Sequence, residues 1–307
     1  MIENETIGFI GLGVMGHAIA DNLLTDGFTL VVYNRTAKKA DDLVAKGAIY
    51  ASTPREVAQQ SDIIMTMVGY PTDVESVYFD QETGIFSGIS AGKIVIDMTT
   101  STPTLAKKIA EKAKGLGVLA LDAPVSGGDI GAKNRTLTVM AGGDQLAFDQ
   151  VADVLSHIAK KWQYFGSAGS GQHVKMANQI GIAGTMTALT ELLVYAKAAG
   201  LPLPDVLDTL SAGGANTWSL TNYGPRILKA DYSPGFFVKH FIKDLKIALD
   251  EAQKMGLTLP ATQNALTLYD QLAEAGYEDD GTQALVHIFS CTNSWTDIGR
   301  KKIRCHH

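Results

Sequence analysis

Short apolar runs recur along the first half of the chain, and segments with helical periodicity separate them. Five of these runs span residues 6–10, 29–33, 62–68, 93–98 and 118–122. They are rich in valine and isoleucine and apolar on both faces, which is typical of parallel strands buried inside a sheet. Helices are expected over residues 14–26, 37–46, 54–60, 73–79 and 103–116. The alternation predicts a doubly wound parallel sheet with helices on both faces.

Two of these helices have a recognisable start. Thr53-Pro54 and Thr102-Pro103 each combine a threonine that can cap a helix with a proline at its first position. A further strand is expected over residues 136–141, followed by a helix over 144–158. We therefore expect the α/β pattern to continue to about residue 165.

The second half of the chain has helical periodicity and almost no strand pattern. Helices are expected over residues 172–199, 204–212, 218–229, 240–255, 261–275 and 281–290. Gly200, Pro202 and Pro204 end the first of them. The change of pattern coincides with the glycine-rich residues 166–171. We predict an α/β domain over residues 1–165 and an all-α domain over residues 166–307.

Composition and charge narrow the class of protein. Of the 307 residues 46% are hydrophobic and 19% charged, so the chain can bury a sizeable core. A formal net charge of −6 argues against nucleic acid as a partner. The longest uncharged run of the second half, between Lys175 and Glu191, is too short and too polar to span a membrane. The start of the chain lacks the pattern of a secretory signal, so we expect a soluble cytoplasmic protein.

Cysteine and histidine spacing gives no sign of a metal site. The two cysteines, Cys291 and Cys305, have no disulfide or zinc spacing, and the seven histidines show no HExxH pattern. The terminal Cys305-His306-His307 is interpreted as a frayed end rather than a metal site. We expect no metal.

The first expected strand runs into a glycine-rich turn, in which Gly11, Gly13 and Gly16 have GxGxxG spacing. Gly11 permits a tight turn, Gly13 lets the backbone approach a pyrophosphate, and Gly16 lets the helix pack against the strand. The helix then offers N–H groups and its positive dipole end to phosphates. We predict dinucleotide binding by Gly11, Leu12, Gly13, Val14, Met15 and Gly16. The alternative is a glycine turn that serves packing alone.

The end of the second expected strand bears on the choice of dinucleotide. An NAD site usually has a carboxylate there to bind the ribose hydroxyls, whereas this chain has Asn34, Arg35 and Thr36. Arg35 and Thr36, with nearby Lys38 and Lys39, could bind a 2′-phosphate through charged hydrogen bonds of roughly 1.5–3 kcal/mol. We predict NADP as the cofactor, with NAD as the alternative. A solvated basic turn would carry the same charges.

Five segments occur in a characteristic order along the chain. They are GFIGLGVMG, DMTTSTP, DAPVSGGDIGA, GSGQHVKMANQ and FIKDLKIAL, which begin at residues 8, 97, 122, 169 and 241. Together they resemble the β-hydroxyacid dehydrogenases, the family that contains 3-hydroxyisobutyrate dehydrogenase. The resemblance implies a Rossmann-type N-terminal domain, a helical domain for substrate binding and dimerisation, and NAD(P)-dependent oxidation of a hydroxy acid.

Lys175 is the candidate acid–base residue, since oxidising an alcohol by hydride transfer requires a group that takes the hydroxyl proton. Its neighbours Val174, Met176 and Ala177 are apolar. A lysine in apolar surroundings loses hydration, which favours its neutral form and suits acid–base chemistry. The same pattern fits a lysine that snorkels from a helix face. The resemblance favours catalysis, because the family's catalytic lysine falls on Lys175.

Asn178 and Gln179 follow Lys175 at i+3 and i+4, near the same helix face. An amide there can bind the substrate oxygen and orient the lysine. Many family members have two asparagines at this point, so the Asn-Gln pair leaves open which amide contacts the substrate. We favour Asn178 as catalytic and place Gln179 among the substrate-binding residues.

Other segments are assigned to the substrate and the cofactor. The glycines of Ser126-Gly127-Gly128 allow a concave array of N–H groups that suits a carboxylate, and the resemblance assigns the substrate carboxylate to this segment. Met67 and Val68 end an expected strand and should line the cofactor crevice.

The resemblance alone places Thr100 near the nicotinamide and Lys243 at the cofactor. The Lys243-Asp244 pair by itself would indicate a solvated helix face. Trp218 could line the substrate pocket, although core packing is the commoner role of a lone tryptophan in a helical domain.

These observations predict an enzyme that interconverts a short 3-hydroxy acid and its semialdehyde or oxo acid. One alternative is a non-catalytic dinucleotide-binding sensor or scaffold, which would not need Lys175 and Ser126 together. An imine reductase is disfavoured because such enzymes typically have another residue in place of this lysine. The length disfavours 6-phosphogluconate dehydrogenase, which has a larger helical domain.

The long helix of the second half also bears on assembly. Its residues 180–199 are strongly apolar, so we expect it to be exposed and to pair with a second copy of the chain. Family members commonly form dimers or tetramers through the helical domain. A homodimer or homotetramer is therefore expected.

Overall fold

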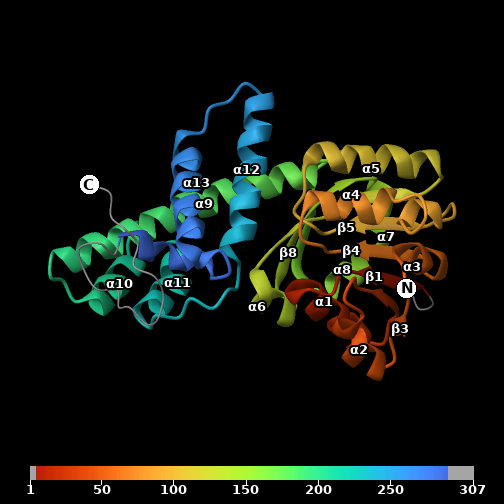
Figure 1. Ribbon diagram of the computed structural model, residues 1–307, viewed down its shortest axis with the longest axis horizontal. Helices are drawn as coiled ribbons and strands as arrows, with labels where there is room; N and C mark the ends of the chain where they lie inside the picture. The colour runs from red at the N-terminus through yellow and green to blue at the C-terminus, as the bar shows by residue number, and fades with distance from the viewer. Residues whose placement is uncertain (1–4, 290–307) are drawn as a thin grey trace. The chain divides into compact units, whose positions relative to one another are not determined.

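A computed structural model describes residues 5–289 of the chain (Figure 1). The chain divides into two compact units, Met1–Lys175 and Met176–His307. The division lies inside one long helix, whose first turns belong to the first unit. Cys291 and the terminal Cys305-His306-His307 lie outside the described residues.

The first unit is built on a twisted sheet. Six of its strands are parallel and follow the order β3-β2-β1-β4-β5-β6. They are β1 (Thr6–Ile10), β2 (Thr29–Tyr33), β3 (Ile49–Tyr50), β4 (Ile63–Thr66), β5 (Ile94–Asp97) and β6 (Leu119–Asp122). This order is that of the dinucleotide-binding Rossmann fold, so the predicted fold class is confirmed for this unit.

The sheet continues beyond β6 with the strand expected over residues 136–141, which is β8 (Leu137–Gly143), and with two strands that the pattern did not predict, β7 (Val125–Ser126) and β9 (Ala159–Tyr164). β8 pairs antiparallel with β6 and with β7, and parallel with β9. The sheet is therefore mixed at this end.

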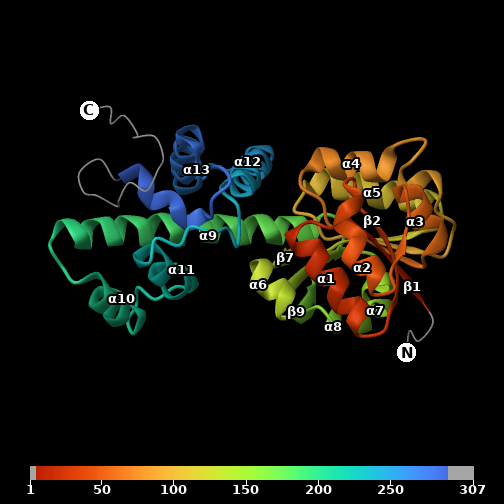
Figure 2. The ribbon, with the colours of Figure 1, turned by 60° about the horizontal axis from the view of Figure 1, so that its bottom comes forward.

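Helices cover both faces of the sheet (Figure 2). One face packs against α1 (Val14–Thr25), α2 (Asp41–Ala45), α7 (Gln145–Gln150) and α8 (Ala152–Ser156). The other packs against α3 (Pro54–Gln60), α4 (Pro71–Phe79) and α5 (Pro103–Gly115). Phe9 belongs to the first core and its neighbour Ile10 to the second, because successive side chains of a strand point to opposite faces.

The two expected helix starts are confirmed. Thr53 accepts a hydrogen bond from the N–H of Glu56 and Thr102 from the N–H of Leu105, both at 3.1 Å. The expected helix over residues 37–46 is a 3₁₀ turn (Ala37–Ala40) followed by α2, and the one over 144–158 is divided into α7 and α8 at Val151. The short α6 (Gly128–Lys133) and a 3₁₀ turn (Ile85–Ser87) complete the first unit.

The second unit is helical, as predicted. Its helices are α9 (Ser170–Ala198), which begins in the first unit, α10 (Leu203–Ser211), α11 (Trp218–Leu228), α12 (Val238–Lys254) and α13 (Pro260–Leu272). A π-helical turn (Ala273–Tyr277) and a 3₁₀ helix (Thr282–Phe289) follow.

The expectation of an exposed apolar α9 was wrong for one face of the helix. Ala183, Met186, Leu189 and Leu193 are buried in the cores of the second unit. The apolar residues on this face of α9 thus serve the unit's own packing. No helix within residues 5–289 is long and apolar enough to cross a membrane.

Candidate active site

The carboxyl ends of the parallel strands lie in register at one edge of the sheet. Ile10 pairs with both Tyr33 and Thr66, Thr66 pairs with Asp97, and Asp97 pairs with Asp122. The site residues predicted in the first unit before α9 lie in the loops that leave these residues or in the elements that follow the loops, α1, β7 and α6. In parallel α/β sheets this edge is where ligands bind.

The glycines of the turn between β1 and α1 differ in what surrounds them. Gly11 has a φ of +100°, and a Cβ atom there would lie 2.2 Å from the carbonyl oxygen of Met67. A Cβ atom at Gly16 would lie 2.0 Å from the carbonyl oxygen of Gly11, whereas one at Gly13 would have no heavy atom within 4 Å. Two glycines therefore permit close packing, and the third leaves its backbone open to a ligand.

The start of α1 is suited to a pyrophosphate. Gly13 is its N-cap without a side-chain cap, and the first turn has no acidic residue. Val14 is exposed, while the Leu12 side chain is in the core and its N–H donates to Asn34 Oδ1 at 2.9 Å. The residues present thus fit the phosphates of a dinucleotide, which Gly13, Val14, Met15 and Gly16 would hold through backbone N–H groups.

The loop after β2 lies beside this turn, because the N–H of Gly11 donates to the carbonyl of Tyr33 at 2.9 Å. Asn34 accepts from Leu12 and donates through Nδ2 to the carbonyl of Thr36 at 3.0 Å. Its side chain therefore braces the two loops. Thr36 is exposed, and the exposed Arg35 lies with Nη1 3.6 Å from Asp73 Oδ1.

The loop after β4 is held by hydrogen bonds to the end of β1 and to the loop after β5. Met67 donates to the carbonyl of Ile10 at 2.9 Å, and the N–H of Val68 donates to Thr99 Oγ1 at 3.0 Å. Met67, Val68 and Thr100 are half-buried. These residues thus lie at the same sheet edge as the glycine turn.

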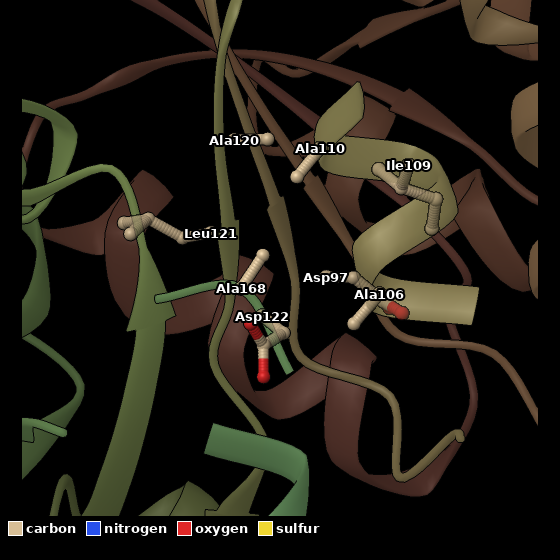
Figure 3. A pocket seen from close by; sticks show the side chains of 8 residues that line it. All are labelled: Asp97, Ala106, Ile109, Ala110, Ala120, Leu121, Asp122 and Ala168. Atoms are coloured by element: carbon tan, nitrogen blue, oxygen red, sulfur yellow. The ribbon is translucent and has the colours of Figure 1, made fainter. Parts of the chain in front are cut away.

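Two buried aspartates end β5 and β6, and the sequence analysis did not single them out. Asp97 accepts from the N–H of Thr99 at 3.0 Å and from the Thr66 hydroxyl at 2.9 Å. Burial raises the pKa of both Asp97 and Asp122 to about 6. They line a cavity of about 10 Å³ together with Ala106, Ile109, Ala110, Ala120, Leu121 and Ala168 (Figure 3). The sequence signal that could have identified these two aspartates is their position at the ends of two expected strands.

Asp122 also holds the beginning of α9. Its carboxylate accepts from the N–H of Gly169 at 2.8 Å and from the N–H of Gln172 at 2.9 Å. Gly169 directly precedes the helix and Gln172 lies in its first turn, where N–H groups have no partner within the helix itself. The helix that carries Lys175 therefore starts at a fixed point on the sheet.

Lys175 is buried, with 7% of its surface exposed. Its Nζ donates to the carbonyl oxygen of Val125 at 2.8 Å. Val125 precedes Ser126, so the amine lies next to the segment predicted to bind a carboxylate. A snorkelling lysine is excluded by this burial.

The Ser126-Gly127-Gly128 segment forms the link from β7 to α6. Gly127 and Gly128 have φ values of +131° and +63°, which L-residues with side chains rarely adopt. Ser126 and Gly128 are half-buried, and Gly127 is exposed. The two glycines allow the sharp bend between the strand and the short helix.

The second unit contains a chain of side-chain hydrogen bonds on α9 and α12. Gln179, which is fully buried, donates through Nε2 to Asp244 Oδ2 at 2.6 Å, and Asn178 Nδ2 donates to Gln179 Oε1 at 2.7 Å. Lys243 Nζ lies 3.1 Å from Asp244 Oδ1. Asp244 is 1% exposed. The Lys243–Asp244 pair is thus no solvated helix face.

Two further sequence expectations concern Trp218 and metals. The structure contradicts core packing for Trp218, whose surface is 64% exposed and whose ring meets Tyr223 edge-on. Within residues 5–289, no group of three or more histidine, cysteine or acidic side chains could hold a metal ion.

Comparisons with known proteins agree with this geometry. Residues 6–166 match the family model described as the NAD binding domain of 6-phosphogluconate dehydrogenase. Residues 169–289 match a second family model, described as "NAD-binding of NADP-dependent 3-hydroxyisobutyrate dehydrogenase". An uncharacterized oxidoreductase of Bacillus subtilis (strain 168) is 50% identical over 285 residues, which are 93% of this chain and 99% of the relative.

Two further relatives have more specific names. The 2-hydroxy-3-oxopropionate reductase of Escherichia coli (strain K12) is 38% identical over 280 residues, 91% of this chain and 95% of that protein. The structure of Mycobacterium tuberculosis 3-hydroxyisobutyrate dehydrogenase with L-serine superposes with a TM-score of 0.85 at 30% identity, covering 92% of this chain and 98% of that one.

The Rossmann sheet, its glycine turn and the helical second unit define an NAD(P)-dependent oxidoreductase. The relatives act, by their names, on short hydroxy or oxo acids. The chain belongs to the β-hydroxyacid dehydrogenase family, as the five sequence segments indicated, and is an NAD(P)-dependent hydroxyacid dehydrogenase.

Proposed function

We propose that the protein interconverts a short 3-hydroxy acid and its semialdehyde or oxo acid, with Lys175 as the general acid and base. The observation that carries this proposal is the buried Lys175 amine, held by the carbonyl of Val125 next to Ser126. A bound nicotinamide would supply or accept the hydride. The chain itself has to bind the acid, orient its reacting oxygen and move one proton.

Lys175 is suited to the proton transfer. An ammonium group has three N–H donors, and the Val125 carbonyl accepts one of them. A second donor directed to a substrate oxygen would give it a proton in reduction, and the amine would take that proton back in oxidation. Burial removes competing water from this group.

The Ser126-Gly127-Gly128 segment is proposed to bind the substrate carboxylate. The positive φ values of both glycines support an array of backbone N–H groups in a tight bend, and Ser126 adds a hydroxyl donor. A substrate whose carboxylate lies there would have its neighbouring carbons close to the Val125 carbonyl that binds Lys175.

Of the two amides after Lys175, Asn178 is proposed to contact the substrate. Gln179 has both of its polar atoms engaged, by Asp244 and by Asn178. A carboxylate only accepts, so Gln179 Nε2 must face Asp244 and its Oε1 must face Asn178. This supports a role for Gln179 in holding Asn178, whose side-chain oxygen remains for a substrate hydroxyl.

NADP is the proposed cofactor, held by the glycine turn. Thr100 is assigned to the nicotinamide, Met67 and Val68 to the cofactor crevice, and Lys243 to the cofactor. The exposed Arg35 and Thr36 after β2 support binding of a 2′-phosphate, since residues 34–36 themselves include no carboxylate for ribose hydroxyls. We expect a higher kcat/KM with NADPH than with NADH, and a smaller preference in Arg35→Ala. A clear preference of the unaltered enzyme for NADH would refute this assignment.

The proposed reaction is tested with Lys175→Met. Oxidation of NADPH is followed by absorbance against a panel of small aldehydes and oxo acids, with Lys161→Met, an exposed lysine on β9, as the matched control. Lys175→Met should lower kcat by at least about 10²-fold and leave NADPH affinity unchanged. Unchanged turnover would exclude the role of Lys175. Tight NADPH binding without turnover of any substrate would indicate the non-catalytic sensor instead.

A cytoplasmic homodimer or homotetramer is the proposed assembly. Tyr195 near the end of α9 is 76% exposed and Leu201 just beyond it 48% exposed, which supports an apolar contact with a second copy. Light scattering at micromolar concentration should give a mass above that of one chain. A monomeric mass would contradict the proposal.

A further inference from the structure

The side chain of Gln172 bridges two main-chain groups in the loop after β5. It is fully buried, its Nε2 donates to the carbonyl of Thr99 at 2.8 Å, and its Oε1 accepts from the N–H of Ser101 at 3.0 Å. These two groups flank Thr100. The carboxamide thus fixes the segment on which Thr100 lies.

The main chain of the same residue is fixed to β6. The N–H of Gln172 donates to Asp122 Oδ2, and that of Gly169 donates to Asp122 Oδ1. A Cβ atom at Gly171 would lie 2.9 Å from Asp122 Oδ2 and 2.4 Å from the carbonyl oxygen of Met140. The start of α9 is therefore packed against the sheet with no room to shift toward it.

Lys175 lies three residues after Gln172 on this helix. Residues at i and i+3 share a helix face and are separated by about 4.5 Å along the axis. The amine of Lys175 in turn donates to the carbonyl of Val125. One side chain therefore connects the loop that carries Thr100 with the turn of α9 that carries Lys175.

We propose that Gln172, anchored by Asp122, is a positioning residue that sets the distance between the Thr100 loop and the Lys175 amine. The inference rests on the proposed role of Lys175 and deepens it. Both polar atoms of the carboxamide bind main-chain groups, one on each side of Thr100. Misplacement of a reacting group by about 1 Å can lower a rate on the order of 10²-fold.

Gln172→Met tests the proposal, because methionine has similar length and no hydrogen-bonding amide. Gln283→Met is the matched control: Gln283 is also fully buried and donates to two main-chain carbonyls, those of Asp231 and Ser233, at 3.0 and 3.1 Å. The measurements are kcat, the Kd of NADPH, the thermal unfolding midpoint, and the isotope effect on kcat with NADPH deuterated at the transferred position.

Gln172→Met should lower kcat by at least about ten-fold, keep the NADPH Kd within about three-fold, and show an isotope effect no smaller than that of the unaltered enzyme. Gln283→Met should lower the unfolding midpoint to a similar extent and keep kcat within about three-fold. The proposal is overturned if Gln172→Met loses less than ten-fold in kcat, or if its isotope effect falls toward unity.

If Gln172→Met does not fold, the positioning role is tested with Gln172→Asn instead. Its amide is one methylene shorter and cannot reach both Thr99 and Ser101, so the same ten-fold criterion applies to it. The Lys175→Met variant distinguishes a failure of the proposed function from a failure of the positioning role of Gln172. A Lys175→Met enzyme with full turnover refutes the proposed function, whereas an inactive Lys175→Met enzyme beside a fully active Gln172 variant refutes only the positioning role.

Discussion

The charge of one buried carboxylate, that of Asp244, determines how the neighbouring amide side chains are oriented. Asp244 can only accept hydrogen bonds, and this fixes which way the Gln179 amide faces and hence how Asn178 is held. The sequence left the roles of Asn178 and Gln179 open, because an i+3 or i+4 spacing does not tell which amide meets a buried carboxylate on another helix. Asp244 itself was interpreted as a solvated residue, since its burial depends on packing between α9 and α12.

Exchanging the charge and the amide tests this orientation. Asp244→Asn and Gln179→Glu should each lower the free energy of unfolding, by about 1–3 kcal/mol, since one loses the partner of Lys243 and the other sets two carboxylates together. In the double variant the new amide at position 244 can donate to the new carboxylate at position 179, which still accepts from Asn178. In denaturant unfolding, the double variant should therefore lose less free energy of unfolding than the sum of the two single variants. A loss equal to that sum would contradict the direct interaction of the two side chains.

The buried aspartates predict a pH dependence of stability. Burial raises the pKa of Asp97 to about 6 from 3.8, so the folded state binds this proton more tightly than the unfolded chain does. Its contribution to stability is present below about pH 4 and is lost as the pH rises through about 6. Between pH 5 and 7 this loss amounts to about 1 kcal/mol.

Asp97→Asn removes this titration and keeps an oxygen for the N–H of Thr99 and the Thr66 hydroxyl. Urea unfolding of the variant should lose less stability between pH 5 and 7 than the unaltered protein does. The charge of Asp122 adds to the raised pKa of Asp97, so the difference in slope measures the removal of Asp97 together with its effect on Asp122. Identical pH slopes would show that Asp97 does not bind its proton more tightly in the folded state.

At the scale of elements, apolar patterning predicted the strands that are buried on both faces, and β1 and β2 have the predicted bounds. It missed β9, whose exposed positions carry Lys160, Lys161 and Gln163, and β3, which consists of two exposed residues. β9 pairs with β8 and β3 pairs with β2, but neither has the continuous apolar run that predicts a buried strand. The links from Gln172 to Thr99, Ser101 and Asp122 were missed because they join segments far apart in sequence.

The turn into α1 offers a comparison of two glycines. Gly16→Ala should destabilise the fold by about 1–3 kcal/mol, because its Cβ atom would meet the Gly11 carbonyl oxygen. Gly13→Ala should change the free energy of unfolding by less than about 0.5 kcal/mol, since its Cβ atom meets nothing.

Binding should show the converse for Gly13→Ala, because its methyl group would occupy the space needed by the pyrophosphate. Fluorescence titration is expected to give an NADPH Kd at least about ten-fold higher, which corresponds to about 1.4 kcal/mol. An unaltered NADPH Kd in Gly13→Ala would show that the phosphates do not bind at this turn.

At the scale of the whole molecule, relatives with different substrate names share this architecture over nearly the full chain. The fold and its motifs thus define the class of reaction, while the acid is selected by side chains that no motif determines. One methylene in a substrate changes discrimination by only about 1–3 kcal/mol. A substrate panel is therefore the direct route to the natural acid.

The role of Lys175 is tested most directly in a single turnover. The enzyme, preloaded with NADPH, is mixed rapidly with the most active acid of the panel, and the loss of nicotinamide absorbance is recorded for the unaltered protein and for Lys175→Met. We expect a rate constant at least about 10²-fold lower in the variant at saturating substrate. Equal rate constants would contradict it, since the proton would then have to come from another group.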